Sequence, residues 1–301
     1  MEQLLQQIAS GLASGAIYAC VALALVMIFT ATDHLNFAQG EMAMFSTYLC
    51  WQMIQWGFGF WTSLAMTAVL SFIIGVLIER IILRPLQGAS VLSSVVVFIG
   101  LLAIFHSLAG AIWSHTIKTF PSPFPTTAFA GSGIIGPHQI GMILVTMIML
   151  LGLFAFFRFT PLGLAMRAAA QNPVSARLVG VRVDWMLALG WGLAAAIGAV
   201  AGAMVAPVVY LEPNMMASIL LYGFAGALVG GISSPGGAVF GGFLVGVLEN
   251  LVAYFGNLTE KLFGIYVIGN GEKLSVALII VITILTLKPA GLFGRVITKR
   301  V

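Results

Sequence analysis

Residues 185–210 read WMLALGWGLAAAIGAVAGAMVAPVVY, a stretch of apolar and small side chains that contains no charged residue. A helix that crosses the hydrocarbon core of a membrane needs about 20 mainly apolar residues. The length and composition of this stretch therefore predict a transmembrane helix.

The same pattern recurs on both sides of this stretch. Seven further runs are candidate spans, at 8–30, 41–57, 62–83, 91–113, 139–158, 236–256 and 274–289. An apolar piece at 217–231 is shorter and ends in glycines. The expected fold is an all-α, polytopic transmembrane helical bundle, with about eight spans plus broken or re-entrant helices, in a single domain over residues 1–301.

The overall composition agrees with a membrane protein. Of the 301 residues, 60% are hydrophobic and only 7% are charged, whereas a typical soluble domain has about 25% charged residues. The mean hydropathy of +1.09 points the same way. So few charges could not cover a soluble surface, and the abundance of apolar side chains excludes intrinsic disorder.

The cationic residues predict the topology. If the spans alternate across the membrane, ten cations fall on one side and three on the other. The ten are Arg80, Arg84, Arg158, Arg167, Arg177, Arg182, Lys288, Arg295, Lys299 and Arg300, and the three are Lys118, Lys261 and Lys273. The ten mark the cytoplasmic side. The C-terminus is then expected inside and the N-terminus outside, if 217–231 crosses or re-enters the membrane. Because topology explains the net charge of +4, nucleic-acid binding is not expected.

The first interruption of the helices is the polar stretch 32–41, TDHLNFAQGE. Asn36 with Gln39 three residues later is typical of an N-cap pair, and Glu41 then enters the next span. The stretch is either a capped cytoplasmic turn or a polar kink that packs in the bundle near a permeation path, since irregular backbone within a membrane must be buried in protein or line a cavity.

The second interruption, about 158–184, is a long connection on the predicted cytoplasmic side. Residues 164–171 favour a helix, and Asn172-Pro173 reads as an N-cap followed by the first residue of a second short helix. Gly180 can end that helix, and Asp184 can cap the next span. Two short capped helices favour a docking site for a partner over an ordinary basic loop.

The third interruption is 230–237, GGISSPGG, in which Ser234-Pro235 reads as an N-cap and a first helical residue. Glycines also repeat at helical spacing, in the pairs Gly226 and Gly230, Gly237 and Gly241, and Gly242 and Gly246. This spacing lets helices approach closely. The segment serves either tight packing alone or a broken helix that borders a translocation path.

Few other polar features remain. The proline-rich connection at about 114–139 is either a plain extracytoplasmic loop or a docking surface. His106 and Glu249 lie within predicted spans, where ionisable groups are costly, so they line a path or make structural hydrogen bonds. No GxxxxGK[ST], HExxH or CxxC motif and no clear catalytic triad occurs. The chain is therefore expected to bind no metal or cofactor and not to hydrolyse ATP.

Four segments in register resemble the permeases of ABC transporters for branched-chain amino acids. They are Asn36–Glu41 (NFAQGE), the glycine-rich 230–242, the stretch Arg167–Gly180, and Lys288–Gly294 (KPAGLFG). The resemblance covers about residues 8–295. The early NFAQGE is similar to the H-type of the two permease subunits.

The resemblance implies an ATP-driven importer in the bacterial inner membrane. Such a subunit pairs with an M-type permease, two cytoplasmic ABC ATPases that bind ATP and Mg²⁺, and a periplasmic substrate-binding protein. The implied ATPase-coupling residues are Arg167, Ala168, Gln171, Asn172, Ala176, Arg177 and Gly180. The candidates for the path or its helix breaks are Asn36, Gln39, Glu41, His106, Gly230, Gly231, Ser234, Gly236, Gly237 and Glu249.

Three alternatives remain at this point. Urea and short-chain amide permeases are similar in sequence to this family, so the solute is open. A secondary carrier or channel would work without an ATPase. A membrane-embedded enzyme is disfavoured because no catalytic cluster is evident in the sequence.

Overall fold

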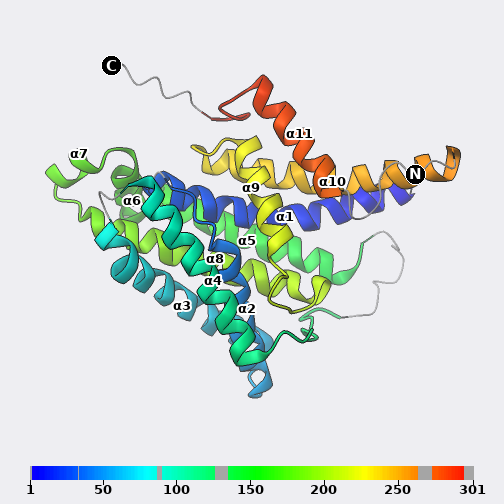
Figure 1. Cartoon of the computed structure of the whole chain (residues 1–301), viewed down its shortest axis with the longest axis horizontal. Helices are drawn as coiled ribbons and strands as arrows, with labels where there is room; N and C mark the ends of the chain where they lie inside the picture. Colours follow the sequence, from blue (N-terminus) through cyan, green and yellow to red (C-terminus); the bar gives the residue numbers. More distant parts are fainter. Residues whose placement is uncertain (1, 33, 87–89, 126–134, 264–272, 295–301) are drawn as a thin grey trace. The chain divides into compact units, whose positions relative to one another are not determined.

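The computed structural model describes residues 2–32, 34–86, 90–125, 135–263 and 273–294, and helices make up most of them (Figure 1). The helices are α1 Glu2–Thr32, α2 Gln39–Gln55, α3 Phe60–Ile78, α4 Val91–Trp113, α5 Pro137–Phe159, α6 Pro161–Gln171, α7 Pro173–Leu178, α8 Val183–Val209, α9 Ala217–Gly230, α10 Pro235–Phe263 and α11 Lys273–Leu287. A π-helical turn, η1 Glu79–Leu83, and a 3₁₀ turn, η2 Arg84–Leu86, extend α3. The predicted all-α polytopic fold is confirmed.

Six helices among the described residues are long and apolar enough to cross a membrane. They are Glu2–Thr30, Phe60–Leu86, Leu92–Trp113, Pro137–Phe159, Val183–Val209 and Pro235–Gly256. Each coincides with a predicted span. The other two predicted full spans, 41–57 and 274–289, correspond to the shorter helices α2 and α11, of 17 and 15 residues. The doubtful piece 217–231 is α9, an apolar helix of 14 residues.

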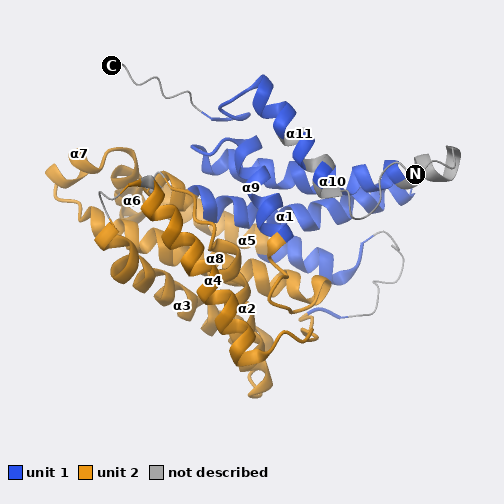
Figure 2. Ribbon diagram, in the orientation of Figure 1, with its two compact units in different colours: residues 1–26, 124–145, 218–301 blue, residues 27–123, 146–217 orange. Residues whose placement is uncertain are grey.

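The chain divides into two compact units (Figure 2). Unit 1 comprises Met1–Val26, Phe124–Val145 and Ser218–Val301, and unit 2 comprises Met27–Pro123 and Thr146–Ala217. That both belong to a single permease domain over residues 1–301 stays a prediction.

Unit 2 is built around α8, which packs against α2 and α3, while α4 packs against α2. Small residues on α8 allow these close contacts. A Cβ on Gly202 would lie 2.2 Å from Thr47 Oγ1, and a Cβ on Gly75 of α3 would lie 2.6 Å from the carbonyl oxygen of Trp191. The fully buried Trp191 ring stacks on Phe98 at 6.0 Å. Small residues thus replace large apolar side chains where helices touch, as is common in membranes.

In unit 1 the helices also pack against one another through glycines. A Cβ on Gly226 of α9 would lie 2.7 Å from Gly242 Cα on α10. A Cβ on Gly246 would lie 2.4 Å from Gly15 Cα on α1. The glycine spacing predicts helices in backbone contact, and the structure confirms it on both faces of α10.

Candidate functional site

The polar stretch before α2 is a buried turn. Asn36 is fully buried, and its Oδ1 accepts a hydrogen bond from the Ala38 backbone N–H at 3.0 Å. The predicted N-cap pair is wrong, because α2 begins at Gln39 after Ala38 and has no side-chain cap. Asn36 instead closes a tight turn with its own neighbouring backbone, a bond that Asn side chains make readily.

Gln39 fixes this turn to unit 2. Its side chain is 1% exposed, and Nε2 donates a hydrogen bond to the carbonyl oxygen of Ala194 on α8 at 2.9 Å. Gly198 lies one helical turn further along, and a Cβ there would approach Nε2 to 3.0 Å. The glycine therefore leaves the room that the amide needs. Asn36 and Gln39 are packed inside protein, as the second of the two predicted alternatives requires, whereas Phe37 is 41% exposed. That the stretch lies near a permeation path stays a prediction.

Glu41 and His106 are brought together within the same unit. His106 Nδ1 on α4 lies 3.3 Å from Glu41 Oε2 on α2, and the two side chains are 31% and 13% exposed. A carboxylate beside an imidazole satisfies two ionisable groups that would be costly apart in a membrane. This contact supports the interpretation that His106 makes a structural hydrogen bond, and not that it lines a path. Within the described ranges, no three His, Cys, Asp or Glu side chains are grouped so as to hold a metal ion.

The two short helices predicted in 158–184 are present as α6 and α7. Thr160 caps α6 by accepting the Gly163 N–H at 3.0 Å, and Asn172 caps α7 by accepting the Ser175 N–H at 2.9 Å. Gly180 follows with φ of +86°, a backbone conformation that favours glycine. The predicted caps at Asn172 and Gly180 are therefore confirmed, and α6 begins three residues earlier than predicted.

Both helices have a buried and an exposed face. Ala169 and Ala176 are buried against Val183 at the start of α8, with Ala168 partly buried beside them. Arg167, Gln171, Asn172 and Arg177 are exposed. The small residues thus fix the helices to unit 2, while the polar side chains lie on the exposed face.

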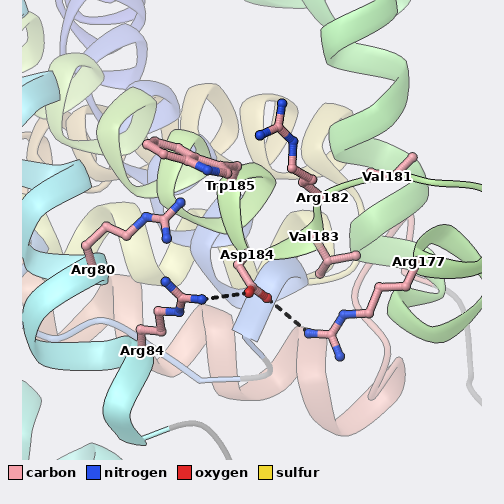
Figure 3. Close-up of a pocket in the computed structure, with 8 residues that line it drawn as sticks. All are labelled: Arg80, Arg84, Arg177, Val181, Arg182, Val183, Asp184 and Trp185. Carbon is pink, nitrogen blue, oxygen red and sulfur yellow. Dashed lines mark hydrogen bonds and ion pairs between the residues drawn. The ribbon is translucent and has the colours of Figure 1, made fainter.

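Asp184 has a role that the sequence pattern did not reveal. The predicted cap is wrong, because α8 begins at Val183 after Arg182 and has no side-chain cap. Instead the two carboxylate oxygens of Asp184 accept hydrogen bonds from Arg84 and Arg177, each at 3.1 Å (Figure 3). The carboxylate joins the end of α3 to α7. Nothing in the sequence pairs residues 100 positions apart, so this triad could not be predicted.

The glycine-rich break lies in unit 1. Ser234 Oγ accepts the Gly237 N–H at 3.1 Å, and α10 begins at Pro235, so the predicted cap is confirmed. Gly231 has φ of +110°, which an L side chain rarely adopts. The Leu292 and Phe293 N–H groups donate to the carbonyls of Val229 and Gly230 at 2.7 and 2.9 Å. The segment KPAGLFG thus satisfies the end of α9, a contact that explains why both segments carry glycines.

Glu249 on α10 is held by a tyrosine. The Tyr18 hydroxyl donates to Glu249 Oε2 at 2.7 Å, and the Tyr18 ring stacks on Tyr222 of α9 at 5.0 Å. The contact supports a structural role for Glu249. Gly236, another predicted candidate, lies in open space, because a Cβ added there would meet no heavy atom of the described chain within 4 Å.

The candidates fall into separate groups. Asn36, Gln39, Glu41 and His106 belong to unit 2, whereas the glycine-rich break and Glu249 belong to unit 1. In the connection at 114–139, Lys118 pairs with Leu211 in an isolated antiparallel bridge, and residues 126–134 lie outside the described ranges. A docking role for this connection is untested.

These features define a class: a multi-pass helical membrane protein whose spans pack through glycine and alanine, and in which the short capped helices α6 and α7 precede the span α8. The model of the family described as "Branched-chain amino acid transport system / permease component" matches residues 7–287, and the chain belongs to this family. It is therefore a permease component of a transport system.

Individual relatives extend over nearly the whole chain. The high-affinity branched-chain amino acid transport system permease protein BraD of Pseudomonas aeruginosa is 29% identical, over 97% of this chain and 96% of its own. The corresponding protein LivH of Escherichia coli is 28% identical over the same shares. Among solved structures, PsaBC from Streptococcus pneumoniae aligns with a TM-score of 0.50 at 13% identity, over 93% of this chain and 91% of that one. At this identity, the structural similarity supports the fold alone.

Proposed function

We propose that this chain is the membrane-spanning subunit of an ATP-driven importer for branched-chain amino acids, and that it forms half of the translocation pathway. The observation that carries the proposal is the family match over residues 7–287, together with relatives that are covered over 96% of their length and are named as high-affinity permeases for these amino acids. The chain itself catalyses no reaction in this proposal.

The energy comes from partner subunits. Two cytoplasmic ABC ATPases bind ATP and Mg²⁺, a second permease of the M-type completes the pathway, and a periplasmic binding protein delivers the solute. The exposed polar faces of α6 and α7 are the contact through which the ATPases act. The rigid capping of both helices supports this role, because a docking element transmits motion only if it holds its shape.

The orientation of the chain follows from its charges. The chain lies in the inner membrane, with its C-terminus in the cytoplasm and its N-terminus outside. Within unit 2, Arg84 precedes α4 and Lys118 follows it, so the 23 residues of this helix separate the arginine-rich end from the single lysine. This arrangement supports the positive-inside assignment.

The solute is selected mainly by the binding protein in this proposal. The described spans offer few charged groups to a zwitterion, and the carboxylates of Glu41 and Glu249 are already bonded to His106 and Tyr18. The chain therefore supplies a passage for a mostly apolar solute, and the specificity lies largely outside it.

Co-purification with the subunits encoded beside it, followed by reconstitution in liposomes, tests the proposal. We expect ATP-dependent uptake of radiolabelled leucine, isoleucine and valine that requires the binding protein. Urea and acetamide are the comparison solutes, and preferred uptake of either would reassign the substrate. Uptake by the purified chain alone, driven by an ion gradient, would overturn the ATPase-coupled function.

A further inference from the structure

A hollow of about 360 Å³ in unit 2 is lined mainly by arginines (Figure 3). Its lining residues are Arg80, Arg84, Arg177, Val181, Arg182, Val183, Asp184 and Trp185. They come from the turns that extend α3, from α7, from the connection between α7 and α8, and from the start of α8. Four guanidinium groups and one carboxylate thus face the same space.

The four arginines outnumber the carboxylates beside them. Asp184 lines the hollow, and Glu79, which precedes Arg80 and is 2% exposed, interacts electrostatically with Arg80 and Arg84. Each oxygen of Asp184 already accepts a bond, one from Arg84 and one from Arg177. Arg80 and Arg182 have no ion pair within the described ranges, and Figure 3 shows the Arg182 guanidinium directed away from Asp184. The hollow therefore carries an excess of positive charge.

Arg80 is the least satisfied of the four. Its Cζ lies 3.8 Å from the centre of a Trp185 ring, so the charge rests on the indole face. Its Nε and Nη2 are shielded from solvent and have no hydrogen-bond acceptor in the described part of the chain. Shielded donors without an acceptor are costly. A rotation of the guanidinium toward the hollow would give them an anionic acceptor.

The position of the hollow matches the boundary of a membrane. Arg80 lies near the end of the apolar span Phe60–Leu86, and Trp185 lies in the first turn of the span Val183–Val209. The Trp185 side chain is 46% exposed, as is typical of tryptophan at the headgroup level. Next to Arg80, Ile81 is 67% exposed and offers an apolar surface. An anion held here would lie at headgroup height.

We propose that this hollow is a binding site for a phosphate group, contacted by Arg80 and Arg182 and supported by Arg84 and Arg177. Phosphate oxygens match the fork of donors on arginine, and charge-assisted bonds of this kind are strong. The phosphate is carried by an anionic lipid headgroup or by a soluble phosphate ion. The proposal goes beyond the transport function and concerns the chain alone.

The test is a titration of the full-length chain, purified in a neutral detergent, with water-soluble dioctanoyl phosphatidylglycerol. The thermal unfolding midpoint gives the apparent affinity. We expect a saturable increase that weakens as NaCl is raised. Parallel titrations with dioctanoyl phosphatidylcholine and with inorganic phosphate separate the sources. A response to phosphatidylglycerol alone identifies a lipid site, and a saturable response to inorganic phosphate identifies a soluble anion; both support phosphate binding.

Two substitutions should weaken the site and one should strengthen it. We expect Arg80→Gln and Arg182→Gln each to lower the affinity at least about tenfold, because each removes charged donors. Arg182 is exposed, so its variant tests the site even if Arg80→Gln fails to fold. Asp184→Asn removes the only carboxylate that lines the hollow and should raise the affinity several-fold, a gain that misfolding cannot produce.

Arg158→Gln is the matched control, because Arg158 is exposed in unit 2 and does not line the hollow. The proposal fails if neither phosphatidylglycerol nor inorganic phosphate gives a saturable response, or if Arg158→Gln weakens binding as much as the two hollow variants. If neither of the two binds and Arg182→Gln lowers ATP hydrolysis in the assembled complex, the arginine cluster binds an acidic protein surface instead.

Discussion

Gln39 donates a hydrogen bond from Nε2 to the backbone carbonyl oxygen of Ala194 at 2.9 Å, and so joins residues 155 positions apart. Because Gln39 is the first residue of α2, this one bond fixes the start of that helix against α8. The buried turn at Asn36 precedes it directly, so the orientation of the whole polar segment depends on the contact.

Replacement of Gln39 by leucine should destabilise the chain. The variant keeps a side chain of similar size but loses the bond to Ala194, and hydrogen bonds between membrane helices contribute about 1 kcal/mol. We expect the midpoint of thermal unfolding in detergent to fall by a few degrees. Gln55→Leu, at the exposed far end of α2, is the control. Equal midpoints for both variants would show that the bond contributes nothing.

Two glycines of α10 should respond in opposite ways to alanine. A Cβ on Gly241 would lie 2.0 Å from the Gly226 carbonyl oxygen, whereas a Cβ on Gly236 meets no heavy atom within 4 Å. Gly241→Ala should therefore cost about 1–3 kcal/mol or more in free energy of unfolding. Gly236→Ala should be neutral or slightly stabilising, because alanine favours a helix. Chemical unfolding of both variants measures the difference, and similar values would contradict close packing of α9 and α10.

The bond between Tyr18 and Glu249 should be measurable in the same way. Tyr18→Phe keeps the stacking on Tyr222 but removes the hydroxyl that donates to Glu249 at 2.7 Å. Loss of this part-buried hydrogen bond should lower the free energy of unfolding by about 1–3 kcal/mol. Tyr254→Phe, on the same helix as Glu249, is the matched control. If Glu249 served only the translocation path, neither Tyr18→Phe nor Tyr254→Phe would change the free energy of unfolding.

What the sequence can predict depends on how far apart the interacting residues are. Ser234-Pro235 and Asn172-Pro173 are correctly predicted as helix starts, because a cap involves a backbone N–H only three residues away. The same rule fails at Asp184, where Arg84, 100 positions away, competes for the carboxylate. The glycine spacing predicts that α10 packs closely, but not that Gly242 meets Ala19. Pairings between distant helices have no local signal, so the sequence predicts the spans and misses their contacts.

The cap of α7 offers a test of the coupling role that leaves the rest of the fold intact. Asn172→Ala removes the oxygen that accepts the Ser175 N–H at 2.9 Å, and loss of an N-cap costs about 1 kcal/mol. The cost falls on a short exposed helix, so the unfolding midpoint of the chain should change little. In the reconstituted importer, we expect solute-stimulated ATP hydrolysis to fall by up to about fivefold, because a loss of about 1 kcal/mol lowers the ratio of folded to unfolded α7 about fivefold. Asn172→Ser restores a capping oxygen and should recover the stimulation, whereas Ser175→Ala keeps the backbone N–H and should have no effect. Full stimulation in Asn172→Ala would mean that the ATPases do not act through a rigid α7.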